Sequence, residues 1–312
     1  MEKSIDWLLE DENPSVKYYT LINILGEKLH PSNVLHYEDL IRKSDPAASI
    51  LSLQDPSGIW HEGNFAYNPL YRASFWQLYF LSLFGVTKNS PGVEKAVRLM
   101  VNDMQTLSGA FPSIGRYSGN LMCMQGITLE MLLRLGYFDA PFTQHLIDFV
   151  TDLVFRNDFR CKYRQQLKCP WGIAKIIRGL NNIPLNNRSE NILKTLNKAT
   201  KFLLSHDIVE ANYPRKKEKS RQWSLFGFPR GFQSDILEIS QILVDAGCSK
   251  QNANIKNAMR YIHNKKLEDW KWKLEFSLNG RMLVDIEKKN KPSKWITYFA
   301  LKTLFKSKFL SI

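Results

Sequence analysis

Two cysteines occupy equivalent positions at the start of two apolar segments, each in a Cys-x-x-Gly motif. Cys123 opens CMQGITLEMLLRLG and Cys169 opens CPWGIAKIIRGL, 46 residues further on. Zinc prefers four nitrogen or sulfur ligands, and thiolates are among the best of them. Cys161 precedes the second motif and His61 precedes an earlier apolar segment, so they could complete the set. The pattern predicts a zinc site at these four residues, against the alternative that the cysteines are small packing residues.

One carboxyl group lies where a catalytic acid would be placed. Asp235, in FQSDILEIS, falls in the first turns of an otherwise apolar helical segment. If it faced a cavity, desolvation would raise its pKa and make it a candidate general acid. The alternative is an ordinary acidic residue at the N-terminal end of a helix, where the helix dipole favours it.

Aromatic and basic residues gather just before the apolar segments or in their first turns. Aromatic side chains there suit an apolar ligand and stabilise a carbocation through their ring faces, and cations suit a diphosphate. The alternatives are rings that pack loop against loop, and cations that pair with surface carboxylates. The predicted substrate-binding residues are Trp60, Tyr71, Arg72, Trp76, Trp171, Trp223, Phe228, Arg281, Lys294 and Trp295.

The elements that position these residues form an internal repeat. Five helical segments that are apolar on all sides start near residues 71, 123, 169, 232 and 294. Three of them run into a glycine at the expected C-terminal position, namely Gly85, Gly136 and Gly247. Segments apolar on every side must be buried on every side. The repeat therefore predicts an inner layer of helices that lead out from aromatic loops.

A more amphipathic helical segment follows each of the first four, at 91–105, 141–155, 190–204 and 253–265. Helix pairs stacked side by side would leave open ends, which a closed ring buries. We therefore expect one all-α domain over residues 1–312, an α/α toroid of about 5–6 helix pairs, with residues 1–50 as an N-terminal capping segment. The strand pattern is weak everywhere, and the best candidate is a short hairpin between 271–276 and 280–286.

Composition restricts the class of protein and of partner. The 312 residues carry a net charge of +13 and are 44% hydrophobic. Such an excess of positive charge favours anionic partners. No nucleic-acid motif accompanies it, so we expect no nucleic-acid partner. No apolar run is long enough to span a bilayer, although peripheral membrane contact stays open, and the charged N-terminal residues favour a cytoplasmic location.

The chain resembles the terpenoid-cyclase and protein-prenyltransferase α/α toroid superfamily, and in particular its prokaryotic prenyltransferase or squalene-oxidase repeat proteins. The resemblance covers nearly the whole chain. The segments NPSVKYYTL, GIWHEGNFAYNPLYRASFWQL, CMQGITLEMLLRLGY, CPWGIAKIIRGL, WSLFGFPRGFQSDILE and NGRMLVDIEKKNKPSKWITYFAL carry it. It implies an apolar, for example isoprenoid, ligand in a central cavity, with cyclisation or prenyl transfer as the reaction.

The chain departs from the catalytic patterns of that superfamily. The Asp-x-Asp-Asp motif of protonating cyclases and the Asp-Asp-x-x-Asp motif of ionising synthases are both absent. Cys123 and Cys169 also resemble the zinc cysteines of the lanthionine-cyclase toroids, but Pro170 stands where those proteins have histidine. A non-catalytic binding toroid and a zinc-dependent thiol-alkylating enzyme therefore remain as alternatives.

Overall fold

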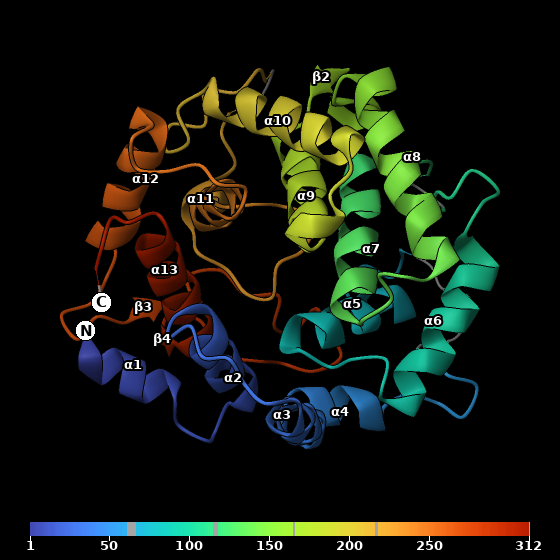
Figure 1. The fold of residues 1–312 in the computed structure, drawn as a ribbon, viewed down its shortest axis with the longest axis horizontal. Coiled ribbons are helices and arrows are strands. Elements are labelled where there is room, and N and C mark those ends of the chain that lie inside the picture. The colour runs from blue at the N-terminus through green and yellow to red at the C-terminus, as the bar shows by residue number, and fades with distance from the viewer. Residues whose placement is uncertain (61–66, 115–117, 165, 216–217, 312) are drawn as a thin grey trace.

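Two concentric rings of helices make up the molecule. The computed structural model describes residues 1–60, 67–114, 118–164, 166–215 and 218–311. The inner ring consists of α2 (Pro14–Asn23), α5 (Ser74–Phe84), α7 (Met122–Arg134), α9 (Pro170–Asn181), α11 (Ile236–Asp245) and α13 (Lys294–Lys306). The outer ring consists of α1 (Glu2–Leu8), α3 (Pro31–Lys43), α4 (Ala47–Ser52), α6 (Pro91–Met104), α8 (Pro141–Asn157), α10 (Glu190–Leu204) and α12 (Ala253–Asn264). Figure 1 shows the outer helices surrounding the inner ones. The fold is the predicted α/α toroid.

The difference between the two rings follows from their sequences. Every residue of α5 is buried, because this helix has neighbours on all sides. In α10 the buried residues Ile192, Leu196, Ala199 and Leu203 recur at helical spacing, and the charged residues between them face water. Three inner helices end at the predicted glycines, Gly85, Gly136 and Gly247, with φ of 96°, 89° and 95°. A residue with a side chain adopts these angles only at a cost, so glycine ends the helix there.

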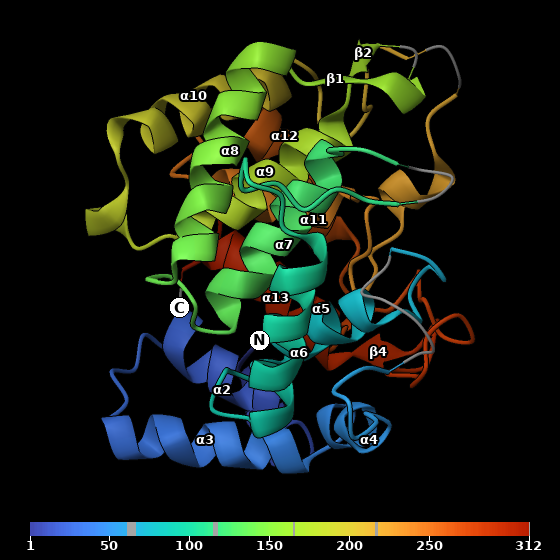
Figure 2. The ribbon, with the colours of Figure 1, turned by 90° about the vertical axis from the view of Figure 1, so that its right-hand side faces the viewer.

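The N-terminal segment closes the ring. α2 lies beside α13, and Tyr19 of α2 reaches the end of α5, where a Cβ atom on Gly85 would lie 3.0 Å from its hydroxyl oxygen. Residues 31–52 form the pair α3 and α4 along one edge of the molecule, as Figure 2 shows. No helix in the described part of the chain is both long enough and apolar enough to cross a membrane.

The Cys-x-x-Gly repeat marks the closest approach between two inner helices. Gly126 of α7 faces the backbone of α9, and a Cβ atom there would lie 2.3 Å from the carbonyl carbon of Lys175. Gly172 of α9 faces the side chain of Met122 instead, at 3.2 Å. The glycine of the first motif therefore lets α7 and α9 touch backbone to backbone.

The short strands form two hairpin-like pairs. β1 (Arg160–Cys161) pairs with β2 (Leu167–Lys168), which the sequence did not indicate. β3 (Trp272–Lys273) lies in the predicted strand 271–276, but its partner is β4 (Pro292–Ser293), so the predicted partner 280–286 is wrong. Residues 280–286 turn back because Asn279 and Asp285 bond to the local backbone at Ile286 and Gly280.

Candidate functional site

The largest described cavity lies at the C-terminal ends of the inner helices and has a volume of about 460 Å³. Its lining includes a residue from the last turns of every inner helix: Asn23, Leu83, Arg134, Asn181, Asp245 and Lys306. Leu185, which is 76% exposed, marks its mouth. The sequence placed the ligand cavity at the opposite, N-terminal ends, and which end binds a ligand stays a prediction.

Phe228, from the loop before α11, and two residues of α13 form an aromatic wall of this cavity. Phe228 stacks on Trp295, with ring centroids 4.2 Å apart and an angle of 17° between the planes. Phe299 packs against both rings. All three line the cavity and are buried in the absence of a ligand. The indole N–H of Trp295 has no hydrogen-bond partner among the described residues.

Arg230, from the same loop, is a buried cation with unused donors. Its side chain is 4% exposed, and its guanidinium lies 4.2 Å from the centre of the Phe299 ring. Nη1 donates to Gln241 at 2.8 Å, whereas Nε and Nη2 have no partner among the described atoms. Burial lowers the pKa of Arg230, and the nearby carboxylate of Glu238 opposes that effect. A guanidinium left partly unpaired in a cavity is arranged to receive an acceptor.

A buried network of charges lies beneath this cavity. Glu238 accepts hydrogen bonds from Lys175 at 2.6 and 2.8 Å and from Arg178 at 2.7 Å. Arg178 also donates to Glu130 at 2.8 Å, and Glu130 receives a further 2.8 Å bond from Arg134. The network ties α7, α9 and α11 together across the inside of the ring.

The charges of the network shift one another's pKa. Burial alone would raise the pKa of Glu238, but Lys175 and Arg178 outweigh it and hold that pKa at about 2. For Lys175, burial lowers the pKa, and Glu238 only partly restores it. Both side chains are fully enclosed, with 0% exposure. We therefore assign this pair to structure rather than to proton transfer with a ligand.

The predicted acid Asp235 caps α11. Its two carboxylate oxygens accept hydrogen bonds from the backbone N–H groups of Glu238 at 2.7 Å and Gly227 at 3.0 Å. Burial raises its pKa to about 6, against the opposing charge of Arg230. It lines a hollow of only about 20 Å³ on the N-terminal side of the loop that carries Arg230. A catalytic role for Asp235 stays a prediction.

That loop also explains why the N-terminal side holds no large central cavity among the described residues. Arg230 lines both the 460 Å³ cavity and the small hollow with Tyr71 and Asp235, so the loop lies between them. It blocks the passage through the ring from the side on which the sequence placed the ligand.

Most of the predicted aromatic residues pack within the protein. Trp60 and Trp223 donate their indole N–H groups to Ile50 and Ile208, at or just beyond the ends of outer helices, both at 2.7 Å. Trp76 donates to the carbonyl of Tyr67 at 2.9 Å. Each of these three indole side chains anchors a loop. Of the predicted substrate-binding residues, Phe228 and Trp295 line the 460 Å³ cavity, and a binding role stays a prediction for all ten.

The predicted substrate-binding cations do not line the 460 Å³ cavity. Lys294 pairs with Glu10 at 2.8 Å and Glu12 at 3.3 Å, and so holds the N-terminal segment to α13. Arg72 is exposed. Arg281 lies over the ring of Tyr71, 5.0 Å from its centre.

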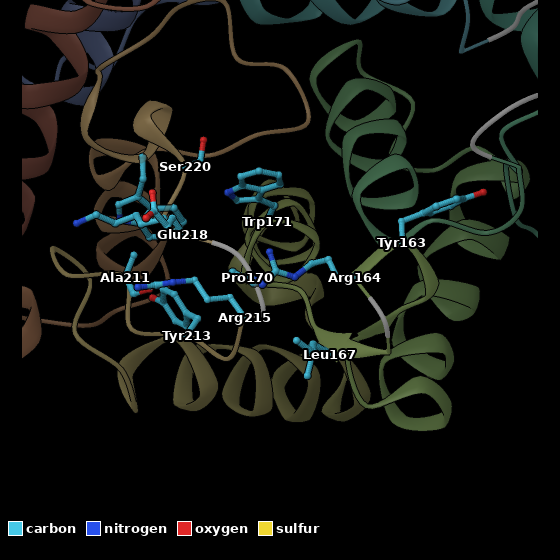
Figure 3. Close-up of a pocket in the computed structure, with 12 residues that line it drawn as sticks. Tyr163, Arg164, Leu167, Pro170, Trp171, Ala211, Tyr213, Arg215, Glu218 and Ser220 are labelled. Carbon is cyan, nitrogen blue, oxygen red and sulfur yellow. The ribbon is translucent and has the colours of Figure 1, made fainter.

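Trp171 lines a separate pocket of about 340 Å³ at the start of α9. Figure 3 shows Arg164 pointing toward Pro170 and Trp171, while Tyr163 points away from them. Trp223 lines this pocket too.

Three predicted metal ligands line one further cavity. Cys123, Cys161 and Cys169 surround a space of about 290 Å³. Among the described residues, no three His, Cys, Asp or Glu side chains are placed to hold a metal ion together. The fourth predicted ligand, His61, lies outside the described residues. Zinc binding at these cysteines therefore stays a prediction.

Hydrogen bonding and burial set the pKa values of these thiols. A hydrogen bond from the Cys169 thiol lowers the pKa of Cys161 and raises that of Cys169. Burial raises the pKa of Cys123 to about 11. Cys161 is therefore the thiol of this group that ionises most readily.

The sequence analysis missed Arg230 and the charged network. A signal was present for the network, since Glu130, Lys175, Arg178 and Glu238 stand in helices that are otherwise apolar on all sides. A charge on such a helix must be buried, and a buried charge needs a partner. No comparable signal marks Arg230, which lies in a loop of mixed composition.

Comparisons with known proteins give no identity. No protein-family model matches the chain, and no curated protein matches it. Among solved structures, it is similar to a glycosyl hydrolase of family 88 from Bacteroides vulgatus, with 11% identity, a TM-score of 0.49, and coverage of 98% of this chain and 99% of that one. It is also similar to the apo form of the type II terpene cyclase MstE from Scytonema, with 11% identity, a TM-score of 0.30, and coverage of 88% and 99%. Such distant likenesses carry no function, and the assignment of the toroid rests on the two rings of helices.

Proposed function

We propose that this chain binds a small organic anion with an apolar body in the cavity at the C-terminal ends of its inner helices. The observation that supports this most is Arg230, whose Nε and Nη2 donors are buried and have no partner in the part of the chain that the structure describes. A guanidinium presents these two donors as a planar fork that fits two oxygens of a carboxylate or a phosphate. The anionic group of the ligand would bind there.

The apolar body would lie against the aromatic wall beside this fork. Phe228, Trp295 and Phe299 line this wall, and the indole N–H of Trp295, which has no partner among the described residues, supplies one more donor. Small-molecule sites combine such apolar walls with a few placed polar groups. An isoprenyl diphosphate has this chemistry, so we extend the proposal to a ligand of that class.

Binding, rather than turnover, is the function that we propose. The carboxylate that lines the cavity, Asp245, is paired with Lys302 at 3.1 Å and Lys306 at 2.7 Å, and these cations lower its pKa although burial opposes them. An acid held ionised in this way is a poor proton donor to a substrate. Prenyl transfer or cyclisation would need a group beyond those in this lining, so product formation is an outcome to be measured.

Geranyl diphosphate is expected to bind the wild-type chain. Arg230→Met is expected to weaken that binding about 10- to 100-fold, because it removes at least one charge-assisted hydrogen bond to the ligand. Isothermal titration calorimetry on the full chain measures this. Arg98→Met is the matched control, because Arg98 is an exposed arginine of α6 that pairs with Glu94. It should bind as the wild type does.

Thermal unfolding without ligand separates binding from folding. Arg230→Met removes a partly paired buried cation but also leaves Oε1 of Gln241 without its donor, so its unfolding temperature should stay close to that of the wild type. Inorganic pyrophosphate should bind more weakly than geranyl diphosphate, because it leaves the aromatic wall uncovered. A folded Arg230→Met that binds geranyl diphosphate as tightly as the wild type would refute the proposal.

A further inference from the structure

The β1–β2 hairpin places two thiols next to each other at the edge of the molecule, a position that Figure 2 shows. Arg160 pairs with Lys168 and Cys161 pairs with Leu167. The register continues inward, because the backbone N–H of Cys169 donates to the carbonyl of Phe159 at 3.0 Å. Cys161 and Cys169 are therefore diagonal neighbours across the hairpin, and diagonal side chains lie within reach of each other.

The surroundings of the two thiols give them different exposures. Cys161 is half-buried and Cys169 is 7% exposed, and both line the 290 Å³ cavity. The same cavity is lined by Arg160 and Lys162, which favour an approaching anion. Cys169 is also the residue at the N-terminal cap of α9, so its backbone is fixed by the helix that follows it. A small solute would meet Cys161 first and Cys169 behind it.

We propose that Cys161 and Cys169 are a redox-active dithiol that reduces small-molecule disulfides. This site is independent of the ligand cavity proposed above. Four unpaired cysteines in one chain are compatible with a reducing compartment, where disulfides that do form are transient and functional.

The reaction proceeds through one mixed disulfide. The Cys161 thiolate, its proton lost to water, attacks one sulfur of R–S–S–R; the bond between the two substrate sulfurs breaks and RS⁻ leaves. Cys169 gives its proton to that RS⁻ and attacks the sulfur of Cys161. The mixed disulfide breaks, the Cys161–Cys169 bond forms, and the second RS⁻ takes a proton from water. Two protein thiols are oxidised, and one disulfide is reduced to two thiols.

Oxidised glutathione is the probe for this reaction, and the readout is alkylation of the quenched full chain followed by mass analysis of its peptides, which assigns each disulfide or adduct to its cysteines. The wild type should form an internal disulfide without a lasting glutathione adduct. Cys169→Ser should instead accumulate one adduct on Cys161, since the second step is blocked. Cys161→Ser should react at least about tenfold more slowly than the wild type. Cys248→Ser is the matched control, because Cys248 is half-buried and does not line the thiol cavity, and it should react as the wild type does.

Several outcomes would overturn the proposal. In the first, the wild type forms no Cys161–Cys169 bond although its thiols still react with an alkylating reagent. In the second, Cys161→Ser reacts with oxidised glutathione as fast as the wild type. In the third, the first glutathione adduct forms on Cys123 or Cys248. Elemental analysis of the wild type tests a fourth outcome. If zinc is bound to these thiols and protects them from oxidised glutathione, the site is a metal site and the redox proposal is wrong. Circular dichroism of each variant confirms that the chain is folded, so a slow reaction cannot be assigned to unfolding.

Discussion

Replacing Glu238 by glutamine is expected to lower the free energy of unfolding by about 3–5 kcal/mol, the usual cost of removing one partner from a buried ion pair. Glu238 is fully enclosed and lies within 2.8 Å of donors on Lys175 and Arg178. Glutamine fits the space but carries no charge. It would leave Lys175 without a counter-ion in an environment where its charge cannot be solvated.

Urea denaturation followed by circular dichroism measures this effect. The matched control is Glu94→Gln, because Glu94 pairs with Arg98 at 2.6 Å on the exposed face of α6. Exposed pairs contribute about 0–1 kcal/mol, so this variant should differ little from the wild type. A loss of less than about 1 kcal/mol in Glu238→Gln would show that the network tolerates an unbalanced charge.

The same residue predicts an acid-dependent loss of stability. Its pKa of about 2 in the folded chain lies below the value of about 4.3 for an unperturbed glutamate. A lowered pKa contributes stability that is fully present above the unfolded value and is lost as pH falls from about 4.3 toward about 2. Glu238→Gln should lack this part of the decline. The difference in unfolding free energy between the two proteins should therefore shrink as the solution is acidified through that range.

Gly126→Ala is expected to destabilise the chain by about 3 kcal/mol, at the upper end of the cost of overpacking. The added Cβ atom would lie 2.3 Å from the carbonyl carbon and 2.5 Å from the carbonyl oxygen of Lys175. Both are backbone atoms of α9, so no side chain can rotate away. α7 and α9 would have to separate, and the bond between Arg178 of α9 and Glu130 of α7 would be stretched.

The second Cys-x-x-Gly motif supplies the control. A Cβ atom on Gly172 would lie 3.3 Å from Cε of Met122, a contact that rotation of this side chain relieves, and 3.2 Å from Cβ of Met122, a contact that needs a shift of only a few tenths of an ångström. Alanine also gains about 1 kcal/mol over glycine in helix propensity. Gly172→Ala should therefore lie within about 1 kcal/mol of the wild type in urea denaturation. Equal losses for Gly126→Ala and Gly172→Ala would contradict the backbone contact as the cause.

The sequence by itself determined the helices, their two kinds and their closure into a toroid. These features follow from the periodicity of apolar residues and from the glycines at the helix ends, which act within one or two turns of the chain. α5 and α10 illustrate this, since one is buried on all sides and the other on a single face, as their sequences predict. The strand partner of 271–276 was predicted wrongly, because pairing depends on a contact with distant Ser293 rather than on local pattern.

Only the tertiary structure decided where the ring is open and which residues meet. Aromatic residues before the inner helices suit a cavity and loop packing equally well, and the indole bonds of Trp60 and Trp223 show that these two anchor loops. Arg230 became a candidate because its loop enters the ring and leaves two donors unpartnered among the described atoms. Its role depends on the positions of Gln241, 11 residues further on, and of Phe299 in α13, which is remote along the chain, and one sequence does not encode such a distance locally.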